Sequence, residues 1–161
     1  MSLTRCYDDD GRVYLVADES LQFSPAVFGI FINENDRILL LRQANTGLYI
    51  PPGLLVPEHE TPGQAIRHYF RRLTGVSPIL GALLLIQEQY RWLEGQGWRV
   101  AAMYYGVQRP FTASLHLNPE AVTGASPEWV ELLTLQRSQF QFGFNAVSAG
   151  IAQLPRQFYR S

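Results

Sequence analysis

The stretch from Gly53 to Val76 reads GLLVPEHETPGQAIRHYFRRLTGV and combines a loop with the signals of one helix. Thr61 is a preferred N-cap residue, Pro62 fits the first helical position, and Gln64 completes a capping box. Gly75 supplies the left-handed residue that ends many helices. Between these ends apolar residues recur at helical spacing, so we predict a helix with one apolar side.

This stretch resembles the Nudix box, G-x5-E-x7-R-E-U-x-E-E-x-G-U, in which U is an aliphatic or bulky apolar residue. When the signature is aligned on Gly75, its first glutamate coincides with Glu60 and its apolar helix position with Phe70. The glycine of the signature falls on Leu54, directly after Gly53. The framework of the box is therefore present.

The acidic residues of the helix are replaced. Tyr69, Arg72 and Leu73 occupy the positions of the three helix glutamates, and His68 occupies that of the arginine. These three positions share one helix face. In the family the helix glutamates hold magnesium, an ion that requires several oxygen ligands. A phenol, a guanidinium and an apolar side chain do not provide such a set, so the resemblance implies a Nudix protein that has lost most of its metal ligands.

Three carboxylates near the box or after it are the candidates for catalysis. Glu60 is the one retained box ligand for a metal ion, and Glu58 lies two residues before it. Glu88 is the third candidate, because some relatives take a catalytic glutamate from a later segment. Glu60 and Glu88 each have a structural alternative. Glu60 can stabilise the helix N-terminus by its charge alone, and Glu88 can be an exposed strand residue.

The substrate-binding candidates lie around the box. We hypothesise that Arg72 replaces the positive charge of the metal and binds a phosphate or carboxylate through its planar guanidinium. The alternative is that its side chain lies in solvent or pairs with a loop glutamate. Aromatic residues in the family often sandwich a nucleobase, although aromatic strand residues are more often part of a core. The predicted substrate-binding set is Arg72, Tyr69, Tyr49, Arg42 and Gly53.

The segments outside the box predict a chain rich in strands. The predicted elements are a polar segment at 1–11, strands at 12–17, 25–33, 38–42, 79–90, 98–107, 114–117 and 128–130, a polar loop at 118–127, an apolar turn at 132–135, a helix at 140–154 and a tail at 155–161. We expect one hairpin to turn at 34–37 and another at 94–97. The order of strand, acidic turn, strand ending in arginine and Pro-Gly before the box extends the resemblance, which implies a Nudix-type α/β/α sandwich with a mixed sheet.

Composition bounds the classes of function. The chain has 161 residues, of which 47% are hydrophobic and 17% charged, so we predict one globular domain spanning 1–161. The net charge of −1 does not favour nucleic-acid binding. A single cysteine, Cys6, excludes an internal disulfide and a cysteine-based zinc cluster. No apolar run has transmembrane length and no signal peptide is recognised, so we expect a cytoplasmic protein without a membrane partner.

Two functional hypotheses follow, and the residues favour the first. In the first, the protein binds a nucleotide-like or other anionic small molecule, or a partner, and hydrolyses its ligand weakly or not at all, without a cofactor. In the second, it is a metal-dependent Nudix hydrolase that cleaves a nucleoside diphosphate linked to another group. Mg²⁺ is then held by Glu60, with help from Glu58 and Glu88. A third interpretation is an unrelated α+β domain. The family is often dimeric, so a homodimer is a further expectation.

Overall fold

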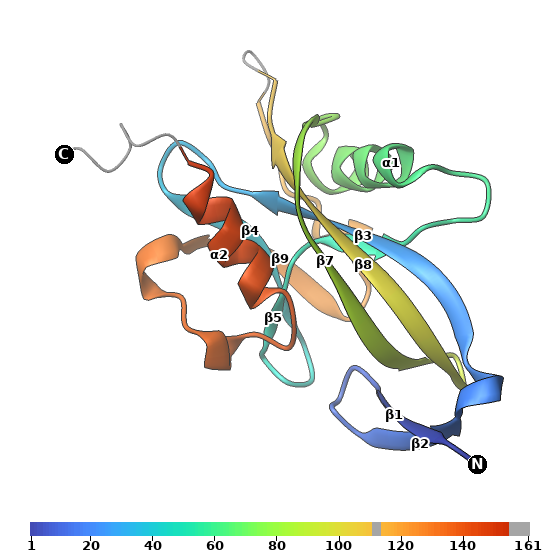
Figure 1. Cartoon of the computed structure of the whole chain (residues 1–161). Coiled ribbons are helices and arrows are strands. Elements are labelled where there is room, and N and C mark those ends of the chain that lie inside the picture. The colour runs from blue at the N-terminus through green and yellow to red at the C-terminus, as the bar shows by residue number, and fades with distance from the viewer. Residues whose placement is uncertain (111–113, 155–161) are drawn as a thin grey trace.

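A computed structural model describes residues 1–110 and 114–154, which form nine strands and two α-helices (Figure 1). The strands are β1 (Leu3–Tyr7), β2 (Val13–Ala17), β3 (Gln22–Phe31), β4 (Arg37–Gln43), β5 (Tyr49–Ile50), β6 (Gly53–Leu55), β7 (Ile79–Leu93), β8 (Gln96–Gln108) and β9 (Ala125–Glu131), and the helices are α1 (Pro62–Thr74) and α2 (Phe144–Ala152). One sheet has the order β2-β1-β7-β8-β3-β6 and the other β5-β4-β9. Because β1 runs parallel to β7 and β3 parallel to β8 while other neighbours are antiparallel, the predicted mixed sheet is confirmed.

Two hydrophobic cores lie on opposite faces of β3. Phe28 and Ile30 belong to the core that includes α2, whereas Val27 and Phe31 belong to the core that includes α1. This alternation follows from the two-residue period of a strand. Figure 1 accordingly shows α1 and α2 on opposite sides of the strands β3, β7 and β8. The predicted arrangement of a sheet between helices is confirmed.

Helix α1 begins and ends where its capping residues predict. The Thr61 hydroxyl accepts a hydrogen bond from the Gln64 backbone N–H at 3.2 Å, and the Gln64 side chain accepts one from the Thr61 N–H at 3.0 Å. Gly75 has φ of 82°, the left-handed conformation expected after the helix. The apolar side packs inward, and its fully buried residues include Phe70 and Leu73.

The predicted polar segment at 1–11 contains an exposed turn after Tyr7, but the prediction missed strand β1 at its start. Strand β1 pairs along its whole length with β2, and Tyr7 also pairs with Arg91 of β7. The Cys6 side chain is fully buried, so β1 has an inward face. The strand has only five residues, which is too short for its alternation to be recognised in the sequence. The turn is closed by Asp8, whose Oδ1 accepts hydrogen bonds from the Asp10 and Arg12 backbone N–H groups at 2.9 and 2.8 Å.

The hairpin predicted around 34–37 is only partly correct. The Asn33 N–H donates to the Arg37 carbonyl at 2.8 Å and Ile32 bridges Ile38, so the chain does reverse there. Beyond that bridge β3 and β4 separate into different sheets. The reason is that β3 already pairs with β8 on one side and β6 on the other, which leaves no edge for β4. The hairpin turning at 94–97 is confirmed as β7 and β8.

Three C-terminal predictions also need correction. The segment 114–117 is not a strand; its His116 N–H donates to the carbonyl that ends α1, on Thr74, at 3.0 Å. Strand β9 begins at Ala125, inside the predicted loop, because it pairs along the full length of β4. Helix α2 begins at 144, since Gly143 has a left-handed φ of 93°. The predicted tail at 155–161 lies outside the described residues, which contain no helix with the length and hydropathy that crossing a bilayer requires.

Candidate functional site

Of the three predicted catalytic carboxylates, Glu58 and Glu60 share the loop before α1, whereas Glu88 lies on β7. Glu60 Oε1 lies 2.9 Å from His68 Nδ1, so the retained box glutamate contacts the residue that replaces the box arginine. Glu58 is exposed in the same loop. Glu88 pairs instead with Arg99 of β8 at 3.4 Å, and both side chains are 52% exposed. Within residues 1–110 and 114–154, no three His, Cys, Asp or Glu side chains gather closely enough to hold a metal ion.

The helix positions that carry glutamates in the Nudix signature do not suit Mg²⁺. Leu73 is fully buried in the α1 core, and Arg72 is exposed. Burial raises the pKa of the Tyr69 phenol to about 12, even though a hydrogen bond from the Gly53 backbone and the Arg72 charge both act to lower it. The phenol therefore stays neutral at physiological pH. One neutral oxygen, one cation and one core side chain do not make an octahedral oxygen site.

Tyr69 and Gly53 do meet in a pocket, which we call the α1 pocket. Its volume is about 320 Å³. Its lining comes from the box, from β4 and the segment after it, from β5, from β7, from the β1–β2 turn, and from the loop before β9 with the first residue of β9. The residues are Asp9, Leu41, Gln43, Asn45, Ile50, Gly53, Tyr69, Arg91, Ala121, Val122, Thr123, Gly124 and Ala125. Neither Arg72 nor Leu73 belongs to this lining. Of the predicted substrate-binding set, the α1 pocket brings together only two residues.

The cation of the α1 pocket is Arg91, a residue that sequence reasoning missed. Its side chain is only 18% exposed, and its Nη2 lies 3.0 Å from Asp9 Oδ1. The guanidinium also lies over the Phe142 ring, 5.4 Å from the ring centroid. Arg91 lines a second cavity of about 340 Å³ as well, the β1 pocket, together with Tyr7, Gly11, Gln89, Tyr90, Gln141 and Phe142. Arg91 thus stands between two neighbouring pockets.

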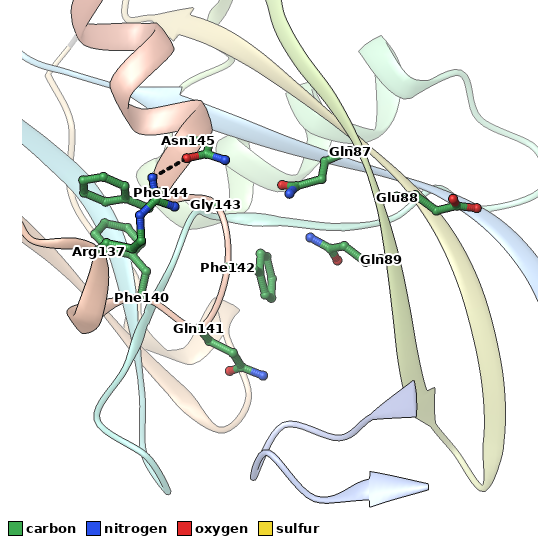
Figure 2. Close-up of a pocket in the computed structure, with 10 residues that line it drawn as sticks. All are labelled: Gln87, Glu88, Gln89, Arg137, Phe140, Gln141, Phe142, Gly143, Phe144 and Asn145. Carbon is green, nitrogen blue, oxygen red and sulfur yellow. Dashed lines mark hydrogen bonds between the residues drawn. The ribbon is translucent and has the colours of Figure 1, made fainter. Parts of the chain in front are cut away.

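A third cavity, the α2 pocket, has a volume of about 230 Å³ and lies against the start of α2 (Figure 2). It shares Gln89, Gln141 and Phe142 with the β1 pocket. Gln89 Nε2 donates to the Tyr104 hydroxyl at 2.9 Å. Among the described residues, however, the side-chain oxygens of Gln89 and Gln141 are buried without a hydrogen-bond donor. Buried acceptors without a donor are uncommon in folded proteins, so these two oxygens mark a place where a ligand could donate.

One sequence pattern could have predicted polar residues of these pockets. Gln87, Gln89 and Arg91 are spaced two apart, which places them on one face of a strand. Figure 2 shows Gln87 and Gln89 directed toward the α2 pocket, whereas Glu88 between them points away. These polar residues form a stripe on a strand that begins with an apolar run. This stripe was the feature of the sequence that could have indicated the site.

Arg42 and Tyr49 form a different cluster. Arg42 Nη2 lies 2.8 Å from Glu128 Oε1 on the neighbouring strand β9, and it also donates to the Tyr49 hydroxyl. The Tyr49 hydroxyl in turn donates to Glu128 at 2.7 Å. The Tyr49 ring belongs to the α2 core and packs on Phe140, with ring centroids 5.9 Å apart. These residues hold β4, β5 and β9 together, and neither Arg42 nor Tyr49 lines any of the three pockets.

This cluster makes part of the stability depend on pH. The hydrogen bond from Arg42 is the largest cause of a lowered Glu128 pKa; burial opposes this shift, and the hydrogen bond from Tyr49 adds to it. A carboxylate with a lowered folded-state pKa stabilises the fold above its ordinary pKa, near 4.5, and loses that contribution as pH falls through the lowered value.

We expect Glu128→Gln to cost less than about 1 kcal/mol near neutral pH, because the pair is partly exposed, and to flatten the loss of stability below about pH 4.5. Urea unfolding at several pH values measures this. Equal acid sensitivity of both proteins would contradict the assignment.

Comparison with known proteins places this geometry in context. No family model matches the sequence, and no curated protein matches it. Among solved structures, the MutT protein from Methanosarcina mazei Go1 is 19% identical with a TM-score of 0.56, over 87% of this chain and 95% of that one. The NUDIX domain of Shewanella oneidensis NrtR, complexed with ADP ribose, is 14% identical with a TM-score of 0.61, over 87% and 94%. A UDP-X diphosphatase is 12% identical with a TM-score of 0.57, over 86% and 64%.

These identities are low, so the likeness concerns the arrangement of the elements. It agrees with what the box at Gly53–Val76 predicts and with the mixed sheet between α1 and α2. The chain therefore has the fold of the Nudix (MutT-like) hydrolases.

Proposed function

We propose that the protein binds a nucleotide-like ligand in the α1, β1 and α2 pockets and hydrolyses it weakly or not at all. The observation that carries this proposal is the sharing of residues between the pockets. Arg91 joins the α1 and β1 pockets, and Gln89 with Gln141 joins the β1 and α2 pockets. A ligand with an anionic part and a planar part with N–H groups matches this order of cation and acceptors.

The anionic part of the ligand is assigned to Arg91. A guanidinium forms charge-assisted, planar hydrogen bonds with phosphate oxygens. Arg91 is mostly buried, so its charge is less screened by solvent than that of Arg72 on the surface of α1. Its present partner Asp9 is 60% exposed and can be displaced by an incoming phosphate. We therefore transfer the role first assigned to Arg72 to Arg91, with Tyr69 and Gly53 as neighbouring wall residues.

The planar part of the ligand is assigned to the side-chain oxygens of Gln89 and Gln141. Each is an acceptor without a donor among the described residues, so an amino or imino group of a base would satisfy it. The Phe142 ring, with the Arg91 guanidinium over one face, lines the same two cavities and provides apolar surface for the base. The NrtR domain of the same fold carries ADP ribose, whose adenine presents an amino group; the chemistry of these residues fits a ligand of that kind.

Weak or absent hydrolysis follows from the donor set on α1. Nudix hydrolysis relies on Mg²⁺ to neutralise the diphosphate, and the side chains of Tyr69, Arg72 and Leu73 do not fit that ion. Glu60 alone, in contact with His68, leaves most of the coordination sphere to water and substrate. No catalytic step through a metal is assigned to these residues.

The test is calorimetric titration of ADP-ribose in buffer with Mg²⁺ and in buffer with EDTA, combined with product analysis. We expect the same Kd in both buffers and little or no release of AMP. Glu60→Gln is the matched variant, and it should bind as the parent does. Rapid hydrolysis in Mg²⁺ that stops with EDTA and is lost in Glu60→Gln would contradict the proposal. It would favour the metal-dependent hydrolase that uses Glu60, Glu58 and Glu88.

A further inference from the structure

We propose that Tyr104 sets the base preference of the ligand site by holding the Gln89 side chain in one orientation. Held in this way, Gln89 offers an acceptor to the base. The site then favours a base with an exocyclic amino group, such as adenine, over one with a carbonyl oxygen in that place, such as hypoxanthine. This preference rests on the proposed function, because it concerns the same ligand. Tyr104 lines neither the β1 pocket nor the α2 pocket, so it acts through Gln89 as a positioning residue.

The Tyr104 ring is held in the core on the α2 side of the sheet. Its side chain is fully buried, and its ring stacks on that of Phe28 from β3, with ring centroids 5.1 Å apart. The chain before α2 lies against it: a Cβ on Gly143 would be 3.6 Å from Tyr104 Cε1. Burial raises the pKa of the Tyr104 hydroxyl well above its ordinary value, although the Arg91 charge and the hydrogen bond from Gln89 both act to lower it. The hydroxyl is therefore a neutral group at a fixed place.

This hydroxyl determines which end of the Gln89 amide faces the pockets. Gln89 Nε2 donates to it at 2.9 Å from the neighbouring strand β7. The amide group is planar and its nitrogen and oxygen lie on separate branches, so the bond to the nitrogen leaves Oε1 to face the pockets. That oxygen is buried and has no donor among the described residues, and Gln89 lines both the β1 and the α2 pocket.

The charge of Arg91 favours the same orientation. Arg91 lies two residues from Gln89 on the same face of β7, and both side chains line the β1 pocket. A side-chain amide orients its dipole in the local field, and a cation attracts the oxygen end. Turning the amide over would bring its amino group toward the guanidinium. Without the Tyr104 hydroxyl, only this electrostatic preference remains, and the amide turns more readily.

A buried acceptor discriminates between bases by the group that lies opposite it. The adenine amino group donates hydrogen bonds, whereas the hypoxanthine oxygen in the same place can only accept and leaves Gln89 Oε1 without a donor. Gln141 Oε1 is a second buried acceptor without a donor in the described part of the chain, and it lines the same two pockets. Two acceptors match in number the two hydrogens of an amino group.

Calorimetric titration of ADP-ribose and of inosine diphosphate ribose tests the preference, since the two ligands differ only in the base. The parent should bind ADP-ribose roughly 10- to 100-fold more tightly. Tyr104→Phe removes only the hydroxyl, so the Gln89 amide can turn and donate to the carbonyl oxygen. The two affinities should then agree within about threefold, and inosine diphosphate ribose should bind Tyr104→Phe more tightly than it binds the parent. A variant that is merely less stable cannot gain affinity for one ligand.

Tyr105→Phe is the matched control. It removes the same group from the next residue of β8, on the face toward α1, and should keep the parent ratio of affinities. Gln89→Met is the second test variant, because it replaces the amide with an apolar group of similar length. It should lose the preference without a gain for inosine diphosphate ribose. Thermal unfolding verifies that each variant is folded.

The outcomes separate the base preference from the proposed function. Equal affinity of the parent for the two ligands would overturn the preference and leave the proposed function intact. A parent ratio that neither Tyr104→Phe nor Gln89→Met changes would also overturn it, because the base would then be recognised elsewhere. If the parent binds neither ligand, the proposed function fails and the preference fails with it.

Discussion

Replacing Phe70 with alanine is expected to lower the free energy of unfolding by about 3–5 kcal/mol. Phe70 is fully buried between α1 and β3, and its ring lies 6.0 Å from that of Phe31. It fits there because residue 29 is glycine: a Cβ at Gly29 would lie 2.5 Å from the Phe70 ring. The neighbouring strand and helix backbones cannot close the space that the ring leaves, so the cavity cost adds to the lost burial. Urea unfolding followed by tryptophan fluorescence measures the change.

The matched control for Phe70→Ala is Arg71→Ala. Arg71 is the next residue of α1 and is exposed, so its replacement should change stability by no more than about 0.5 kcal/mol. The converse variant, Gly29→Ala, should destabilise by overpacking, because its new methyl group would meet the same ring. A loss below about 1 kcal/mol for Phe70→Ala would mean that α1 is not anchored to β3 by this side chain.

The box helix could be predicted from the sequence because its signals are local. Thr61, Gln64 and Gly75 fix the two ends through contacts within a few residues, and the apolar spacing fixes the buried face. The hairpin of β7 and β8 is local in the same sense, since its strands are joined by a short turn. Such features depend on neighbours along the chain and not on the rest of the fold.

Pairing between distant segments could not be predicted in the same way. Strand β4 leaves the preceding strand β3 to pair with the distant β9, and β1, besides pairing with its neighbour β2, lies next to the distant β7. Which strands share a sheet depends on which edges are already occupied, and that is a property of the whole fold. Adjacent residues of a strand lie on opposite faces, but only the fold shows that Leu41, and not Arg42, lies on the face that lines the α1 pocket.

The candidate site likewise contains residues that a local motif predicts and residues that only the fold brings together. Tyr69 and Gly53 were predicted because they belong to the box, whereas the α1 pocket is completed by Asp9, by Arg91 and by the loop before β9. These segments are far apart in the sequence and no motif joins them. Tyr49 and Arg42 were assigned to the ligand because an arginine and an aromatic residue precede the box. In the structure both side chains donate hydrogen bonds to Glu128, and the three residues hold three strands together.

Replacing Arg91 with alanine is expected to weaken ADP-ribose binding by roughly 10- to 100-fold, because a hydrogen-bonded charge pair with a phosphate is lost. Arg91→Lys keeps the charge but not the planar fork and should lie between the parent and Arg91→Ala. Arg99→Ala is the matched control. Arg99 lies on the adjacent strand β8 and pairs with Glu88, and both side chains are half exposed. Calorimetric titration gives the affinities, and thermal unfolding verifies that each variant is folded.

A variant of Asp9 distinguishes a ligand-binding role of Arg91 from a purely structural one. Asp9 pairs with Arg91 at 3.0 Å and is mostly exposed, so a ligand phosphate must compete with it for the guanidinium. If Arg91 binds the anion, Asp9→Asn should tighten ADP-ribose binding while leaving stability almost unchanged. If Arg91 only anchors the β1–β2 turn, Asp9→Asn and Arg91→Ala should disturb stability alike, and neither should alter affinity in a folded protein. Opposite effects of the two substitutions on Kd are therefore the result that a binding role requires, because a purely structural ion pair loses the same interaction from either side.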